Sequence, residues 1–492
     1  MPSDKKNSSW LSFQFIITLI FSLLILKLNL KHYGEKPFCI WILLASIWGF
    51  GAILDFGFNT AIVKYVAEFR NETKKINKLL SSSLFVFLIT GLAILIIGSI
   101  IGYLAYLNNQ KIIPKESQIF YIIVFVILGL SFYLQYLSWF FKAIMEGMNN
   151  FILTSKLAIF QNSLMLAGTI IISVTKQNLI ALSVLYFVTN FIILFSYILY
   201  FRIKTRNFLI KINLFDFKEV KRILGFSLSV QAMNVFSALI DPIVKYMLGT
   251  YLDVRIIPAY EIARRFAIAI SGLFFNAYKI VLPKASILKT EKEIKNFILD
   301  DLIRYCKIGI TYSGIAFGIL SLPIVFIINS VFGIKEATLI FIILSIPETI
   351  NNFGYPIYNF LLGIGKANLL VIVQITNLIC VIVGLFVGFN IFHNLFGLLS
   401  YFISVMIGNI LMIIYLKNRW TISLTDFLTG VNIYKLGILI FFLSIVLLSI
   451  KKEFFSVYFD FAALSVLSYL VFYRDIHRYI KIFIGRDLFN TR

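Results

Sequence analysis

Apolar runs of roughly 20 residues recur along the whole chain, and a helix of about that length is needed to cross a bilayer core of about 30 Å. Hydrophobic residues make up 60% of the 492 residues and charged residues only 14%, too few to cover a soluble protein of this size. A transmembrane barrel would show short alternating segments, which the sequence lacks. The sequence therefore predicts an all-α polytopic membrane protein.

The lengths and spacing of the apolar runs predict about fourteen transmembrane helices, arranged as two six-helix bundles with pseudo-twofold symmetry and two further helices. The expected helices are 11–30, 38–60, 79–107, 119–140, 151–175, 179–201, 223–249, 257–283, 302–330, 337–363, 368–390, 394–416, 432–450 and 454–473. The expected divisions are an N-terminal bundle at 1–201, a basic cytoplasmic linker at 202–222, a C-terminal bundle at 223–416, and two extra helices with a basic cytoplasmic tail at 417–492.

The formal net charge of +22 is distributed between the apolar runs. Lysines and arginines favour alternate connecting segments by about three to one, which is the bias that holds cytoplasmic loops inside. We therefore expect both termini on the cytoplasmic side of a cell inner membrane, and no nucleic-acid partner. The three cysteines and three histidines are scattered and fit no metal-ligand spacing, so we predict no metal site.

The stretch Trp48–Arg70, WGFGAILDFGFNTAIVKYVAEFR, contains an acid inside an apolar segment. Asp55 is costly in a bilayer unless it faces other protein or water. Asn59 lies one helical turn further along, on the same face. Gly57 allows close packing there, and Lys64 begins the basic end. We expect Asp55 to tune the charge of a site or to bind a coupling ion, and Gly57, Asn59 and Lys64 to form a gate or hinge.

The expected seventh and eighth helices carry more intramembrane charge than any other pair. Asp241 and Lys245 are four residues apart on one helical face, and Glu261 is spaced three and four residues from Arg264 and Arg265. Counted from the connecting turn, these charges lie roughly 12–13 Å deep at about 1.5 Å per residue. Adjacent arginines point about 100° apart, so one is free to pair with an acid while the other faces an interior cavity.

Two interpretations of this cluster stay open. It is either a set of ion pairs that fixes helix packing, or a cationic patch lining a water-filled path for an anionic ligand. The surplus of positive charge, increased by Lys279, favours the second. A phosphate group relieves the cost of a guanidinium at this depth by bidentate pairing.

Glu348 lies near the middle of the expected tenth helix, in the segment PETINNFGYPIYNFLLGIGK. Its two prolines and several glycines predict a broken or bent helix, and such breaks line cavities because the freed backbone groups need partners. Glu348 is a candidate proton or coupling-ion site. The alternative is a hydrogen bond between helices.

Several motifs resemble those of the Wzx-type polysaccharide flippases. GAILDFGFNTAIVKYVAEF resembles the signature of the family's second helix, with Lys64 at its basic position. ALIDPIVKYMLGT and AYEIARRF resemble its half-way segment, and VLPK and LLGIGKAN are also similar. The chain departs from the family at VRIIPAY, where a glycine-containing link is usual. The last two helices carry no signature.

This resemblance implies membership of the multidrug/oligosaccharidyl-lipid/polysaccharide exporter superfamily. It implies a flippase that moves undecaprenyl-diphosphate-linked oligosaccharide by ion-coupled alternating access, with H⁺ or Na⁺ as coupling ion and no other cofactor. Such a protein serves O-antigen or other surface polysaccharide synthesis. Its expected partners are the lipid-linked oligosaccharide, membrane lipids, a polysaccharide polymerase and a chain-length regulator.

On this interpretation the diphosphate binds a cationic cavity, and acids tune its charge or bind the coupling ion. The predicted cavity residues are Arg264, Arg265, Lys245 and Lys279. The predicted charge-tuning residues are Asp55, Asp241, Glu261 and Glu348.

Three other functions are alternatives to this interpretation. A cation-coupled multidrug extruder of the same superfamily needs a cavity rich in acids, and a peptidoglycan-precursor flippase shares the expected fold. A membrane polysaccharide polymerase is an enzyme that needs a large external loop or an acidic pair near the outer surface, and the first outer loop offers only Glu35. We therefore predict that the protein is not an enzyme.

Overall fold

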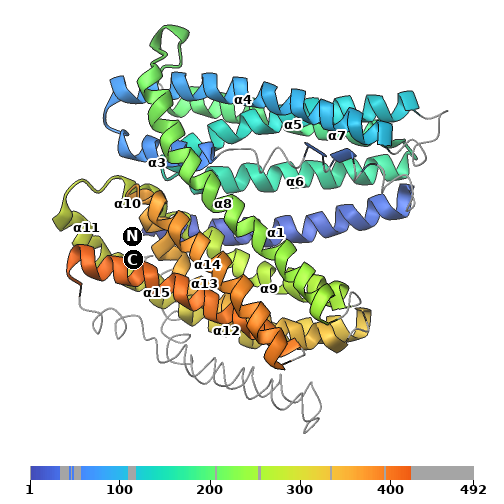
Figure 1. Cartoon of the computed structure of the whole chain (residues 1–492). Helices are drawn as coiled ribbons and strands as arrows, with labels where there is room; N and C mark the ends of the chain where they lie inside the picture. The colour runs from blue at the N-terminus through green and yellow to red at the C-terminus, as the bar shows by residue number, and fades with distance from the viewer. Residues whose placement is uncertain are drawn as a thin grey trace, which may run out of the picture. The chain divides into compact units, whose positions relative to one another are not determined.

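A computed structural model describes residues 2–33, 57–108, 118–205, 208–252, 256–332, 335–392 and 395–422, together with 41, 44, 45, 47 and 48. Every long element in these residues is a helix (Figure 1). The long helices are α1 (Pro2–Tyr33), α4 (Thr73–Asn108), α5 (Gln118–Gly147), α6 (Phe151–Val174), α7 (Leu179–Lys204), α8 (Phe217–Tyr251), α9 (Ile256–Tyr278), α12 (Ile303–Ile327), α13 (Lys335–Gly363), α14 (Ala367–Phe392) and α15 (Ser400–Trp420). The short ones are α3 (Phe58–Glu68), η2 (Ile212–Leu214), α10 (Val281–Ser286), α11 (Glu291–Phe297), η3 (Ile298–Leu302), η4 (Ile328–Phe332) and η5 (Leu395–Leu399).

The helices follow the apolar runs. Within the described residues, ten helices are long and apolar enough to cross a membrane. The expected fold class is confirmed: the protein is an all-α, multi-pass membrane protein. The expected helices at 432–450 and 454–473, most of 38–60, and Asp55 lie outside the described residues.

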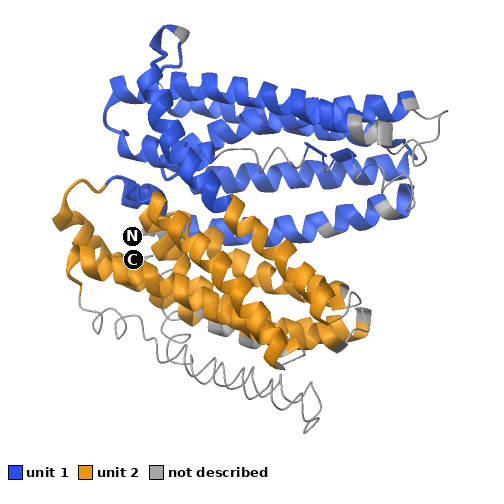
Figure 2. Cartoon of the chain, viewed as in Figure 1, with its two compact units in different colours: residues 1–234, 282–287, 363–367 blue, residues 235–281, 288–362, 368–492 orange. Residues whose placement is uncertain are grey.

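The chain divides into two compact units, shown in Figure 2. Unit 1 comprises residues 1–234, 282–287 and 363–367, and unit 2 comprises residues 235–281, 288–362 and 368–492. The division falls inside α8, which begins at Phe217, within the expected linker 202–222, and is one continuous helix. The expected boundary at that linker stays a prediction.

In unit 1, α5 packs along α7 and α4, and α1 packs along α6. Figure 1 shows α4, α5 and α7 side by side. An aromatic cluster fills the space between α3, α4 and α5: the ring of Phe87 lies 6.0 Å from Phe58, 5.0 Å from Tyr136 and 5.4 Å from Phe140, centroid to centroid. Dispersion contacts of this kind hold membrane helices together, because lipid leaves little hydrophobic driving force between them.

In unit 2, α13 is the internal helix. Its most apolar window is 89% buried, against 22% for α14. Side chains from α8, α9, α12, α13, α14 and η5 form one apolar core around it. A helix enclosed by other helices is where a membrane protein tolerates polar groups, because lipid does not reach them.

The sequence predicted a broken or bent helix at Glu348, and the prediction of a break is wrong. α13 continues from Lys335 to Gly363 through both Pro347 and Pro356. Each proline removes one backbone donor, but the surrounding helices and polar side chains of a buried membrane helix compensate for that loss. Glu348 therefore projects from an intact helix.

Candidate functional site

Unit 2 contains a cavity of about 320 Å³, lined by five of its helices and by η5. The polar side chains of the lining are Ser237 and Asp241 from α8, Tyr260, Arg264 and Ser271 from α9, Glu348, Asn351 and Tyr355 from α13, Gln374 and Asn377 from α14, and Tyr401 and Ser404 from α15. Cavities of this size and mixed polarity between helices are typical ligand sites. The site combines charged, amide and phenolic groups inside a membrane-spanning unit.

Asp241 organises the charges at one side of this cavity. Its Oδ2 lies 2.8 Å from Nζ of Lys245, one helical turn along α8. Its Oδ1 lies 2.9 Å from Nε of Arg264 on α9 and accepts a hydrogen bond of 3.2 Å from the hydroxyl of Tyr260. A carboxylate with this many donors fixes the positions of its partners.

The structure separates the two adjacent arginines. Arg264 lines the cavity, and its side chain is 32% exposed. Arg265 points elsewhere: its side chain is 77% exposed and lies 3.6 Å from Glu261, which also pairs with Lys245 at 2.8 Å. Of the two, Arg264 is therefore the one placed to contact a ligand in the cavity.

Glu348 lies in the same cavity lining as Arg264. It is buried, with 8% of its surface exposed, and its Oε2 accepts a hydrogen bond of 3.5 Å from Nδ2 of Asn351. A buried carboxyl that faces an internal cavity in a membrane protein is a candidate for reversible protonation or cation binding.

The charge of the lining differs from the expected cationic cavity. Its strongly acidic and basic side chains are Asp241, Glu348 and Arg264, which are two acids and one base. Lys245, Arg265 and Lys279 do not line it. The sequence could not assign the faces on which these three side chains lie, and their depth in the membrane stays a prediction. Lys279 lies in the turn after α9, with its Nζ 5.5 Å from the ring centroid of Phe275.

The predicted gate residues belong to unit 1 and are not among the residues that line this cavity. Gly57 begins α3 with a positive φ of 71°. Asn59 is half-buried in the first turn. Lys64 is buried; its Nζ lies 3.0 Å from Glu68 and 4.1 Å from the ring centroid of Tyr65. These contacts define a packed end of α3, and the gating role stays a prediction.

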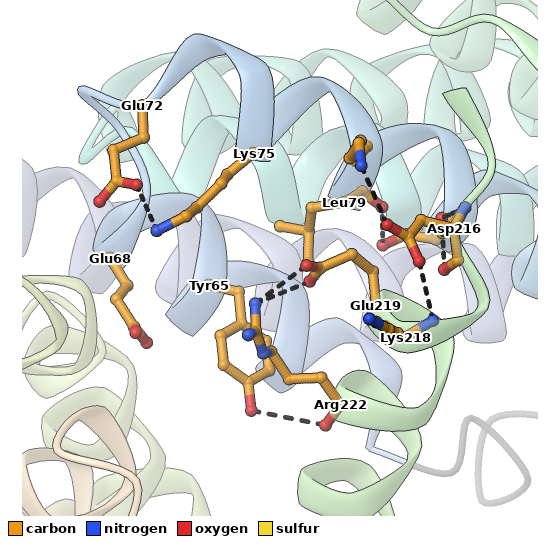
Figure 3. Close-up of polar contacts among 12 residues, drawn as sticks. Tyr65, Glu68, Glu72, Lys75, Leu79, Asp216, Lys218, Glu219 and Arg222 are labelled. Atoms are coloured by element: carbon orange, nitrogen blue, oxygen red, sulfur yellow. Dashed lines mark hydrogen bonds and ion pairs between the residues drawn. The ribbon is translucent and has the colours of Figure 1, made fainter. Parts of the chain in front are cut away.

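Figure 3 shows how this end of α3 meets α8. The hydroxyl of Tyr65 donates to the backbone oxygen of Arg222 at 3.5 Å, and the guanidinium of Arg222 pairs with Glu219 at 2.9 Å. In the segment that precedes α8, Asp216 pairs with Lys78 of α4 at 3.1 Å. Polar contacts thus tie three helices of unit 1 together.

Sequence reasoning missed the amide and phenol groups on α14 and α15. Gln374, Asn377 and Tyr401 complete the cavity wall, and Oδ1 of Asn377 is buried without a hydrogen-bond partner among the residues that the structure describes. The signal was present: an amide inside an apolar span needs an internal partner, much as an acid does.

Comparison with protein-family models and with curated protein sequences finds no match. Solved structures do match. The MATE transporter VcmN of Vibrio cholerae in its bent form has a TM-score of 0.65 at 11% identity, over 88% of this chain and 98% of that one. A MATE in complex with MaD5 has a TM-score of 0.66 at 15% identity, over 89% and 97%.

A third match is a multidrug resistance MATE family transporter of the MOP superfamily in an outward-facing conformation, with a TM-score of 0.62 at 14% identity, over 89% of this chain and 96% of that one. The chain therefore has the fold of the MATE transporters along most of its length. At sequence identities of 11–15%, this similarity shows the fold of the chain alone.

Proposed function

We propose that the protein is a transporter that moves lipid-linked oligosaccharide across the cytoplasmic membrane, taking the diphosphate into the cavity of unit 2. The observation that carries this proposal is the placement of Arg264, whose guanidinium lines an internal cavity beside Asp241 and Glu348. A diphosphate matches the fork of a guanidinium. The flippase-like motifs of the sequence and the MATE fold support the same interpretation.

In this proposal the two acids work against the substrate charge. Asp241 holds Arg264 in place through a contact of 2.9 Å. Ionised, Glu348 repels a diphosphate, and protonated or bound to a cation it does not. Exchange of that proton or cation across the membrane therefore couples an ion gradient to release of the anion. Transport of this kind breaks no covalent bond.

The test uses full-length protein in phosphatidylcholine vesicles containing a fluorescent undecaprenyl-diphosphate oligosaccharide, with a proton or sodium gradient imposed. The accessible fraction of the label reports movement between leaflets. Arg264→Gln should slow flipping by about tenfold to a hundredfold, because a charge-assisted hydrogen bond contributes about 1.5–3 kcal/mol.

Arg265→Gln is the matched control, since it removes the same group from the neighbouring position, which does not line the cavity. It should retain most of the wild-type rate. Equal losses in the two variants, or no flipping by the wild type under either gradient, would contradict the proposal.

A second candidate is a cation-coupled extruder of organic cations. It is favoured by the excess of acids in the cavity lining, Asp241 and Glu348 against Arg264. The same vesicles distinguish the two functions when loaded with a fluorescent organic cation. Gradient-driven movement of that dye, abolished by Glu348→Gln and unaffected by Arg264→Gln, would establish the extruder.

A further inference from the structure

The connection between α7 and α8 lies between two apolar spans, of which that of α7 ends at Lys204 and that of α8 begins at Phe217. We refer to residues 208–216 of this connection, together with residues 217–222 at the start of α8, as the α7–α8 shelf. Hydrogen bonds fix its backbone to the first half of α4: Leu209 N to Oδ1 of Asn77 at 2.9 Å, Lys211 N to Oγ of Ser81 at 3.1 Å, and Asp216 N to Oγ of Ser82 at 2.9 Å.

The shelf holds large apolar side chains on the outside of unit 1. Leu209 is 45% exposed, Phe215 40% and Phe217 70%. The ring of Phe215 lies 4.9 Å from that of Phe85 on α4, so its position is fixed by a second helix. Exposed Phe and Leu side chains beside basic residues are typical of a surface that lies at the boundary between lipid tails and headgroups.

Internal partners neutralise the acids of the shelf. Asp216 pairs with Lys78 at 3.1 Å, and Glu219 pairs with Arg222 at 2.9 Å, as Figure 3 shows. Lys211, Lys218 and Lys221 are exposed, and their ammonium groups take part in no ion pair within the part of the chain that the structure describes. The shelf therefore presents positive charge outward.

Charge and apolar surface occur together on the shelf. Phe217 and Lys221 are one turn apart on α8, so they share a face, and Phe215 and Lys218 are near neighbours in the chain. The ligand that matches cations beside apolar rings at the end of a membrane span is an anionic lipid: its phosphate faces the ammonium groups and its acyl chains contact the rings.

We propose that the α7–α8 shelf is a binding site for the headgroup of an anionic phospholipid, with Lys211, Lys218 and Lys221 as the phosphate-binding groups and Phe215 and Phe217 as the acyl-chain contacts. This proposal is independent of the transported substrate. Because hydrogen bonds to α4 hold the shelf in place before any lipid binds, little ordering is required on binding, which favours affinity.

The test measures stabilisation of the purified full-length protein in neutral detergent. Phosphatidylglycerol added to the detergent should raise the melting temperature by mass action, and phosphatidylcholine should not. In the triple variant Lys211→Gln/Lys218→Gln/Lys221→Gln, the concentration of phosphatidylglycerol needed for a given rise should increase about a hundredfold at low ionic strength, on the basis of about 1 kcal/mol per lysine near an anionic surface.

A matched triple, Lys292→Gln/Lys366→Gln/Lys417→Gln, removes three exposed lysines outside the shelf and should retain the wild-type response. Phe217→Ser changes no charge and should weaken the stabilisation by phosphatidylglycerol severalfold. This variant provides the test if the lysine triple variant fails to fold. The proposal is overturned if phosphatidylcholine is equally effective, if inorganic phosphate alone reproduces the effect, or if the two lysine triples behave alike.

Discussion

Two cationic side chains of unit 2 form ion pairs with the same carboxylate. Asp241 contacts both Lys245 and Arg264, and Lys245 in turn contacts Glu261. Interleaved pairs of this kind lower the cost of placing charge within a membrane span. They also fix the position of Arg264, because its Nε pairs with Asp241, which lines the same cavity.

At the same scale, Asp216 makes the stability of unit 1 depend on pH. Its carboxylate accepts a hydrogen bond from the backbone N–H of Lys218 and pairs with Lys78, and these contacts lower the pKa of Asp216 below its usual 3.8. Because the folded state has the lower pKa, the stabilisation is complete above about pH 4 and is lost as the pH falls through the folded value.

Asp216→Asn should therefore lower the melting temperature at pH 7. The difference in melting temperature between this variant and the wild type should shrink as the pH falls below 3.8. Melting curves in detergent from pH 7 to about pH 2 measure this difference. Asp300→Asn, at an exposed position, is the control and should remain close to wild type throughout. A difference for Asp216→Asn that is the same at every pH would contradict the assignment.

Among the elements, α3 depends on the glycine that begins it. Gly57 has a φ of 71°, and a Cβ there would lie 2.8 Å from the backbone oxygen of Ser227 and 2.7 Å from Cβ of Val230 on α8. A left-handed conformation costs a side chain about 1–2 kcal/mol, and the contact with backbone adds to that. Gly57→Ala should therefore destabilise the protein by at least about 2 kcal/mol.

Gly225→Ala is the matched control in unit 1. Gly225 lies inside α8 with open space around its Cβ position, so alanine should stabilise the helix by about 0.5–1 kcal/mol. The free energies of unfolding of the Gly57→Ala and Gly225→Ala variants are compared in mixed micelles that contain an increasing fraction of denaturing detergent. Similar effects from both substitutions would show that the close approach of α3 to α8 is not required.

For the whole molecule, the charge bias predicts which connections face which side. With the N-terminus inside, the turn after α6 is external and the α7–α8 shelf is cytoplasmic. In a chain whose three cysteines are replaced by serine, Lys176→Cys should react with an impermeant maleimide in intact cells. Lys211→Cys should react only after the membrane is opened. The reverse pattern would invert the topology.

Much of the helical architecture could be predicted because helix length is imposed by the bilayer rather than by tertiary contacts. The expected spans at 151–175 and 368–390 match α6 and α14 to within two residues. The prolines of α13 misled the prediction of a break, because the sequence does not show how completely other helices enclose α13.

For this protein the sequence by itself determined the class and most of the helical spans, since both depend on local composition and on the thickness of the membrane. Only the tertiary structure decided which charges meet. It placed Arg264 in the cavity and Arg265 outside it, and it brought amides from α13 and α14 to the same lining. The physical reason is that the packing of neighbouring helices decides which side chains face the interior of the unit and which face lipid. That packing is a property of the whole unit.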